Sequence, residues 1–93
     1  MSYNISLQFE AITDIRQSFD WYEQQQNGLG YEFLEEINEC FEKLSHHPLH
    51  YSATNQQFRK IKVNRFPFII IYEFDSDTIF INSVRHTGRK PKV

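Results

Sequence analysis

The chain has 93 residues, of which 40% are apolar and 16% aromatic, and its formal net charge is −2. These values predict one globular domain over residues 1–93, with a core that needs no disulfide or metal, and they exclude a disordered or fibrous chain. No apolar run approaches the roughly 20 residues that span a bilayer, and the start of the chain has no signal-peptide pattern. Cys40 is the only cysteine, so no internal disulfide can form and we expect a cytoplasmic protein.

The charge is unevenly divided between the two halves of the sequence. Residues 1–50 contain two Lys and Arg residues against nine Asp and Glu residues, a net charge of −7. Residues 51–93 contain eight against three, a net charge of +5. This asymmetry favours a polar partner or two different partners. The total of −2 argues against a protein that coats nucleic acid.

The first half of the chain changes its hydrophobic period once. Residues 3–9 alternate with period two, which predicts a strand with one buried side. Apolar residues then recur at three and four positions over 10–26 and again over 33–44, which predicts two helices. The segment 27–30 contains two glycines and separates them, and Pro48 ends the second helix near residue 45. We therefore expect an antiparallel helical hairpin.

The second half of the chain is predicted to consist mainly of strands. Residues 46–57 show no period and are expected to form a loop. Three strands are predicted at 58–64, 67–74 and 78–85, and residues 86–93 form a tail. The expected order is β-α-α-β-β-β, an α+β domain in which the helical hairpin packs on one face of a mainly antiparallel sheet.

Both faces of the predicted sheet are apolar. Alternation gives the last two strands apolar residues on both sides and puts Phe80 and Val84 on one shared side. The residues that we assign to the second, partner-binding side are Ile69, Ile71, Ile79 and Ile81. One helical hairpin covers only one face, so the other must meet the 46–57 loop, the tail or another molecule. An uncovered apolar patch of this kind usually marks a partner site.

Basic side chains gather near the ends of the predicted strands. They are Arg59, Lys60, Lys62, Arg65, Arg85, His86 and Arg89. Alternation puts Lys60 and Lys62 on one side of their strand and Arg59 on the other. Such a cluster can hold a phosphate and shuttle a proton in RNA cleavage. The alternative is a solvated basic edge that blocks aggregation.

Two further features suggest chemistry less strongly. His46, His47 and His50 lie close together in the sequence, but no Cys, Asp or Glu accompanies them. We therefore expect a polar loop rather than a metal site, and no cofactor. Cys40 lies at the margin of the apolar stripe of the second helix, so we expect a small buried residue rather than a nucleophile.

A series of short motifs runs along the chain. The segments are Ala11-x-x-Asp14-Ile15, Trp21-Tyr22-Glu23, Gly28-Leu29-Gly30-x-x-Phe33-Leu34, Pro48-x-x-Tyr51, Arg59, Phe66-Pro67-Phe68-x-Ile70-x-Tyr72 and Ser83-Val84-Arg85-His86-x-x-Arg89-x-Pro91. In this order they resemble the RelE/ParE superfamily of toxins from type II toxin–antitoxin systems, over about residues 5–91. The fold that the resemblance implies, a helical hairpin on an antiparallel sheet, agrees with the periodicity.

The resemblance implies two alternative activities. RelE-like members are ribosome-dependent mRNA endonucleases, whereas ParE-like members poison DNA gyrase. The RelE-type pattern has an Arg early in the central strand, where this chain has Ile69, and a C-terminal aromatic acid–base, which Arg89–Val93 lacks. Losing one electrostatic donor of this kind costs about 3–4 kcal/mol of transition-state stabilisation. The Phe66–Tyr72 segment is similar to ParE-like members.

We therefore expect a ParE-like toxin of a plasmid-stabilising module that binds a protein target such as DNA gyrase. The resemblance implies a cognate antitoxin as partner, DNA binding only through that antitoxin, and no membrane; a homodimer is a further option. The residues expected at the partner interface are Ile69, Ile71, Ile79, Ile81, Arg59, Arg85 and Arg89.

Two other functions stay open from the sequence. The first is a ribosome-dependent RNase in which His86 shuttles the proton. In that enzyme the residues that neutralise the phosphate are Lys60, Lys62 and Arg85. The second is an inactive homologue that only represses transcription together with its antitoxin.

Overall fold

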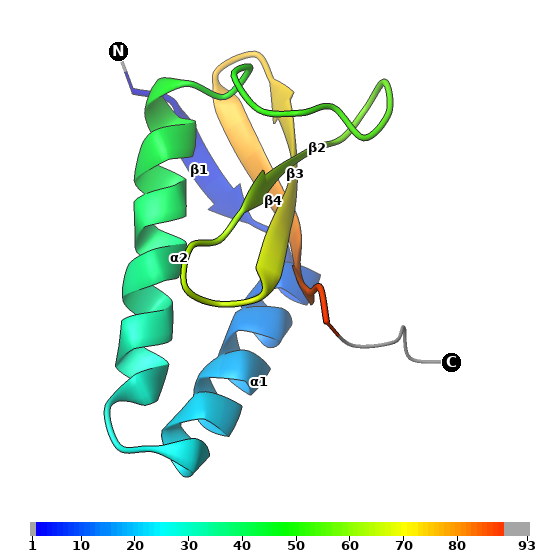
Figure 1. Ribbon diagram of the computed structural model, residues 1–93. Helices are drawn as coiled ribbons and strands as arrows, with labels where there is room; N and C mark the ends of the chain where they lie inside the picture. Colours follow the sequence, from blue (N-terminus) through cyan, green and yellow to red (C-terminus); the bar gives the residue numbers. More distant parts are fainter. Residues whose placement is uncertain (1, 89–93) are drawn as a thin grey trace.

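The computed structural model describes residues 2–88 and consists of two helices and a four-stranded sheet (Figure 1). The elements in chain order are β1 (Asn4–Leu7), α1 (Phe9–Gln25), α2 (Leu29–His46), β2 (Arg59–Lys62), β3 (Phe68–Asp75) and β4 (Thr78–His86). This order confirms the predicted β-α-α-β-β-β arrangement. In the described part of the chain, neither helix is long and apolar enough to cross a membrane.

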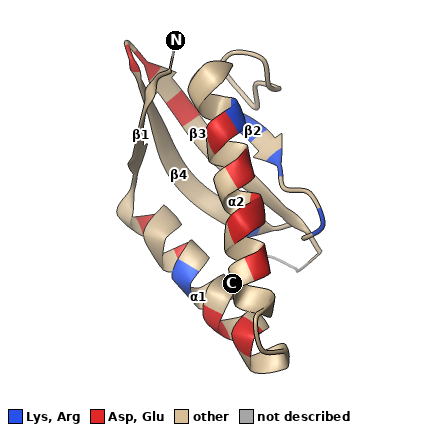
Figure 2. Ribbon diagram, turned by 90° about the vertical axis from the view of Figure 1, so that its left-hand side faces the viewer, with Lys and Arg blue, Asp and Glu red and all other residues tan. Residues whose placement is uncertain are grey.

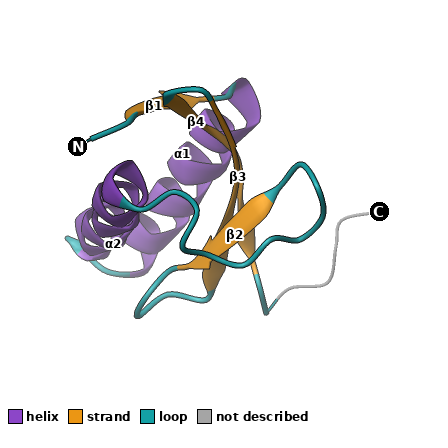
Figure 3. Ribbon diagram, turned by 90° about the horizontal axis from the view of Figure 1, so that it is seen from above, coloured by secondary structure: helices purple, strands orange, loops and turns teal. Residues whose placement is uncertain are grey.

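The sheet has the strand order β1-β4-β3-β2. β2, β3 and β4 form an antiparallel meander, and β1 joins the far edge of β4 in parallel. A two-residue turn connects β3 to β4, with Asp75 opposite Thr78 and Ser76 at a φ of 58°. Both helices lie on one side of the sheet (Figure 3). We call the side that faces the helices the inner face and the opposite side the outer face.

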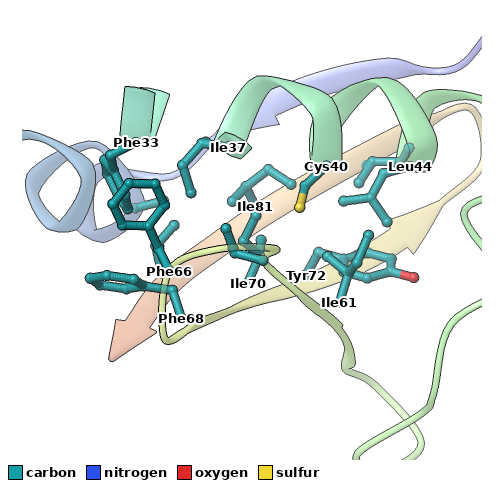
Figure 4. Close-up of a cluster of buried hydrophobic side chains, with 14 of the residues drawn as sticks. Phe33, Ile37, Cys40, Leu44, Ile61, Phe66, Phe68, Ile70, Tyr72 and Ile81 are labelled. Atoms are coloured by element: carbon teal, nitrogen blue, oxygen red, sulfur yellow. The ribbon is translucent and has the colours of Figure 1, made fainter. Parts of the chain in front are cut away.

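The core lies between the inner face and the helices (Figure 4). Its fully buried side chains include Phe33 and Leu44 from α2, Ile70 and Tyr72 from β3, and Ile79 from β4. Burying a side chain of this size contributes about 1.5–3 kcal/mol. The expected burial of Cys40 is confirmed, since it is only 3% exposed.

Two glycines and one glutamate shape the helical hairpin. Gly28 precedes α2 with a φ of 88°, a conformation that favours glycine. Gly28 has no side chain that could cap α2. The Glu23 carboxylate of α1 caps the helix instead, because it accepts hydrogen bonds from the N–H groups of Gly28 (3.2 Å) and Gly30 (2.8 Å). At Gly30 a Cβ would lie 2.8 Å from the backbone oxygen of Phe19. The helices therefore approach closely, and α2 begins inside the predicted 27–30 break.

A hydrogen bond from the backbone of β4 to a side chain of α1 connects these two elements. β1 pairs with β4 only as far as Leu7 and Ile81, so within residues 2–88 no strand lies beside the edge of β4 beyond this point. The backbone N–H of Val84 instead donates to the Asp14 carboxylate of α1 at 2.9 Å. Asp14 thereby satisfies a backbone donor that would otherwise cost free energy when buried.

Candidate partner-binding face

The outer face of the sheet carries an apolar strip between basic residues. Register places Lys62 opposite Ile69, and Ile69 opposite Arg85, so these three form one cross-strand row. Lys60 and Ile71 form the next row towards the hairpin turn. Ile69 and Ile71 are half-buried, whereas the side chains of Lys60, Lys62 and Arg85 are exposed. The outer face is therefore apolar at its centre and cationic at the end that holds Lys62 and Arg85.

The prediction that Ile79 and Ile81 share this partner-binding face is wrong. Both are 0% exposed and lie on the inner face. The short turn between β3 and β4 pairs Phe74 with Ile79 and Tyr72 with Ile81, and residues opposite one another in a sheet share a face. These two isoleucines belong to the core beneath the helices, so no partner can contact them in the folded chain.

The prediction that Phe80 and Val84 share a face is also wrong, and a β-bulge is the reason. Ile71 pairs with Ser83 although its neighbour in β3 pairs with Ile81, so Asn82 is an extra residue in β4. The bulge reverses the alternation beyond it. Val84 therefore points into the core at 4% exposure, while Phe80 is half-buried on the outer face.

Arg59, predicted at the rim of the interface, instead fastens the 47–58 loop to the sheet. Its guanidinium donates to the carbonyl oxygens of Tyr51 (2.7 Å) and Leu49 (3.4 Å). On the neighbouring strand the Tyr72 hydroxyl donates to the carbonyl oxygen of Pro48 at 2.6 Å. Burial raises the pKa of Tyr72 to about 12, against the opposing effect of the Arg59 charge. These hydrogen bonds give a structural role to four residues of the motif series, Pro48, Tyr51, Arg59 and Tyr72.

The 47–58 loop therefore lies at the β2 end of the sheet. Ala53 forms an isolated bridge with Arg59, and the Gln57 amide donates to Glu73 at 3.2 Å. These contacts lie at the β2 edge and at the turn end of the outer face. Ile69 and Ile71 keep part of their surface accessible, so the loop does not remove the apolar strip from solvent.

The candidate nuclease residues are divided between the two faces. Lys60, Lys62 and Arg85 project from the outer face, whereas His86 lies opposite Phe68 on the inner face. The two rings of that pair meet edge to face with centroids 5.0 Å apart. His86 Nδ1 also accepts a hydrogen bond from the backbone N–H of Gly88 at 3.0 Å. The structure therefore brings the three cations together without the imidazole that was predicted to shuttle the proton. Arg89, predicted at the partner interface, lies outside the described residues.

Carboxylates lie within ion-pair distance of two of the arginines. Figure 2 shows the acidic row along α2, which consists of Glu32, Glu35, Glu36, Glu39 and Glu42. Arg65, in the turn after β2, donates to Glu32 of α2 at 2.6 Å and lies 3.6 Å from Glu36. The bond with Glu32 raises the pKa of the Arg65 guanidinium. Arg85 lies 4.0 Å from Glu10 and donates to the Ser83 hydroxyl at 3.3 Å. The acidic row of α2 is therefore partly neutralised by the sheet half of the chain.

A hollow of about 510 Å³ lies beside β2, between the end of α2 and the 50–52 segment. It is lined by Lys43, His50, Tyr51, Ser52, Lys60, Ile61, Lys62, Asn64 and Ile69. None of the described residues that line it carries a carboxylate. The sequence reasoning missed this site, because Lys43 lies far from the other two lysines in the sequence and joins them only through the packing of α2 against the sheet.

The histidine segment, which we expect to be a polar loop, and Cys40, which we expect to be a buried residue rather than a nucleophile, can be placed as well. Among residues 2–88, no three His, Cys, Asp or Glu side chains are arranged to hold a metal ion. His47 and His50 lie beside one another with ring centroids 6.4 Å apart. Burial raises the pKa of the Cys40 thiol to about 11, and the thiol donates to the carbonyl oxygen of Lys62 at 3.8 Å. Such a neutral, buried thiol is a poor nucleophile.

Comparison with known proteins decides the family. The sequence profile described as "ParE toxin of type II toxin-antitoxin system, parDE" matches residues 5–91. The chain belongs to this family. The RelE/ParE resemblance of the motifs is thus confirmed, and the matching profile is that of the ParE branch. A search of curated proteins finds no significant match.

Solved structures share the fold of this ParE-family toxin at low sequence identity. One is from the chromosomal ParDE system of P. aeruginosa, with a TM-score of 0.79 and 15% identity over 91% of this chain and 96% of that chain. Another is from the toxin–antitoxin complex RelBE2 of Mycobacterium tuberculosis, with a TM-score of 0.68 and 18% identity over 92% and 99%. A mutant of E. coli toxin RelE in the free state matches with a TM-score of 0.69 and 16% identity over 95% and 86%.

Proposed function

We propose that this ParE-family toxin acts by binding a protein target in the cytoplasm, with DNA gyrase as the first candidate, and that a cognate antitoxin neutralises it by covering the outer face. One observation carries the proposal: Ile69 occupies the centre of the row between Lys62 and Arg85, while His86 lies on the opposite face. The cations can bind an anion, but His86 does not stand beside them for general acid–base chemistry, and the imidazole that lines the hollow with Lys60 and Lys62 is that of His50. The apolar strip with its cationic end suits a protein surface.

The antitoxin part rests on family membership and on the outer face. The P. aeruginosa and M. tuberculosis structures come from systems whose names pair a toxin with an antitoxin. A partner that covers Ile69 and Ile71 would bury apolar surface that the helices leave open, and acidic side chains on it would meet Lys62 and Arg85. The first experiment is to co-purify the chain with the protein encoded by the adjacent reading frame.

The RNase alternative is supported by one observation, the shared face of Lys60, Lys62 and Arg85. A double variant, Arg85→Ala with His86→Ala, separates the two mechanisms. We expect growth arrest to persist in cells that express this variant, with mRNA intact and gyrase supercoiling activity reduced in extracts. Loss of arrest together with mRNA cleavage by the parent chain would contradict the proposal. Expression of the parent chain without any growth effect would favour the inactive homologue.

A further inference from the structure

β1 forms one edge of the sheet, and the backbone groups on its far side are unused (Figures 2 and 3). The N–H groups of Asn4 and Gln8 turn towards β4, where they donate to carbonyl oxygens at 3.0 Å and 2.9 Å. Alternation therefore points the N–H and C=O groups of Ile5 and Leu7 away from β4. Within residues 2–88 no other strand or loop pairs with these groups.

The other edge of the sheet, at β2, is protected in ways that the β1 edge is not. The Lys60 N–H donates to the Ser52 carbonyl oxygen of the loop at 3.0 Å, and the Lys62 carbonyl oxygen accepts from the Cys40 thiol at 3.8 Å. The two lysines also put charge on that edge. Residues 2–9, by contrast, contain no charged side chain and no proline. An edge strand without such protection readily pairs with another chain.

Exposed apolar side chains continue the β1 edge. Leu7 at the end of β1 is 38% exposed, and α1 begins directly after it with Phe9 at 84% and Ile12 at 50% exposure. Phe9 and Ile12 are three residues apart in the helix and therefore neighbours on its surface. We call these three side chains, with the outward backbone of Ile5 and Leu7, the β1 edge surface. Exposed apolar clusters of this kind mark sites of protein association.

We propose that the β1 edge surface binds a second copy of this chain, with the two β1 strands antiparallel about a twofold axis at Ser6. In this register Ile5 of each copy lies opposite Leu7 of the other. These are the two residues whose N–H and C=O groups point outward, so each strand supplies the acceptors and donors that the other needs. An isologous contact requires the same patch to be complementary to itself, and this edge meets that requirement.

Charge favours a second copy over other occupants of this edge. Because residues 2–9 are uncharged, two identical edges meet without repulsion, whereas two β2 edges would bring lysines together. An acidic partner segment, as expected on the outer face, would find no cation along β1. The shared surface consists of a strand of four residues and three apolar side chains. It is smaller than the roughly 1,600 Å² of a standard interface, so we expect a weak dimer with a Kd of about 1–100 μM.

The dimer would place the two outer faces side by side. Residues opposite one another across a strand pair share a face, so both outer faces point to the same side of one continuous sheet. A protein with two equivalent binding sites could then contact both copies at once and gain avidity. This consequence rests on the proposed function, whereas the dimer itself does not.

The first experiment measures self-association and amide exchange of the wild-type chain. Sedimentation equilibrium from about 1 to 100 μM should show a monomer–dimer equilibrium. Hydrogen exchange at the Ile5 and Leu7 amides should slow as the protein concentration rises. The Ser6 amide, which points towards β4, should exchange slowly at every concentration and serves as the internal control.

The second experiment places a charge on the edge. Leu7→Lys should weaken self-association about tenfold or more, because the ammonium groups of the two copies would meet in the dimer. Leu49→Lys is the matched control, since Leu49 is 60% exposed in the 47–58 loop, and it should leave the equilibrium unchanged. Circular dichroism checks that both variants fold. If Leu7→Lys does not fold, Phe9→Lys at the more exposed position takes its place and should also weaken self-association.

Three results would overturn the inference. They are a chain that stays monomeric at about 100 μM, exchange at Leu7 that does not depend on concentration, and a folded edge variant that dimerises as tightly as the wild-type chain. If instead the protein from the adjacent reading frame protects the Leu7 amide while the chain alone stays monomeric, the edge belongs to that partner. The inference is then wrong and the proposed function stands. Failure of the chain to bind that protein, with dimerisation intact, would leave the dimer established and count against the proposed function alone.

Discussion

The two faces of the sheet use the same residue type for different purposes. Ile70 and Ile71 are neighbours in β3, yet Ile70 is completely buried under the helices and Ile71 stays half-buried opposite Lys60. The inner face continues into aromatic rings that pack against Phe33. The outer face continues into charged and polar side chains such as Arg85 and Glu73.

This contrast shows that apolar content alone does not identify a partner surface. Tight packing fixes the inner face, so substitutions there change stability. The outer face is apolar only in its middle and is cationic at one end, so substitutions there should change binding with little change in stability. The variants below test this division, in order of decreasing expected effect.

Replacing Ile70 or Ile71 by alanine gives the sharpest contrast in stability. Ile70→Ala removes a fully buried side chain and should lower the free energy of unfolding by about 2–5 kcal/mol. Ile71→Ala removes a half-buried one and should cost about 1 kcal/mol or less. Urea unfolding followed by circular dichroism measures both. Equal costs would mean that the two faces are not distinct.

Gly30→Ala tests the close approach of the helices that cover the inner face. The added methyl group would meet the Phe19 ring and backbone oxygen at 2.8 Å, so we expect a loss of about 1–3 kcal/mol. Gly28→Ala is the control, because its Cβ meets no atom within 4 Å and only its φ of 88° opposes the change. The Gly28 variant should lose about 1 kcal/mol. Thermal unfolding that ranks Gly28→Ala as the more harmful change would contradict this packing.

Tyr72→Phe tests the fastening of the loop at the edge of the inner face. It leaves the buried carbonyl of Pro48 without a donor and should cost about 1–3 kcal/mol near neutral pH. In the parent chain the pKa of Tyr72 rises from 10.0 to about 12 on folding, so its stabilising contribution is complete below pH 10 and is lost as the pH rises through 12. Between pH 8 and pH 11 the urea concentration at the midpoint of unfolding should therefore fall less steeply in the variant than in the parent chain. A steeper fall in the variant would contradict the assignment.

Glu23→Ala should have the smallest effect on stability. It removes the carboxylate that accepts hydrogen bonds at the start of α2, and such a cap is worth about 0.5–2 kcal/mol. Gln24→Ala, an exposed position next to it, is the control and should be nearly neutral. A stability for Glu23→Ala indistinguishable from this control would show that water satisfies the helix end equally well.

Hydrophobic periods were sufficient to predict the element order and the helical hairpin. They work because each helix and strand buries one side, and the buried side sets the period. The parallel pairing of β1 with β4 was not predictable from them, since alternation in 3–9 is the same whichever strand lies beside it. The bulge at Asn82 was equally invisible, and it moved Val84 to the core.

The candidate site was predicted only in part, for two physical reasons. Pairing of Tyr72 with Ile81 depends on turn length, and it places Ile79 and Ile81 inside. Motif positions such as Arg59 recur for structural roles as readily as for binding, and only the bond to the Tyr51 carbonyl reveals which role applies here. The hollow at Lys43 needs tertiary packing to exist at all.

The most direct test of the account compares two double variants in binding to the protein from the adjacent reading frame. One is Ile69→Ala with Ile71→Ala, which shortens the outer apolar strip. The other is Phe9→Ala with Ile12→Ala, which removes apolar side chains that are 84% and 50% exposed on α1. We predict that the first weakens affinity about tenfold or more while the chain stays folded, and that the second leaves affinity unchanged. Unchanged affinity in the first variant, or a larger loss in the second, would contradict the outer face as the partner-binding surface.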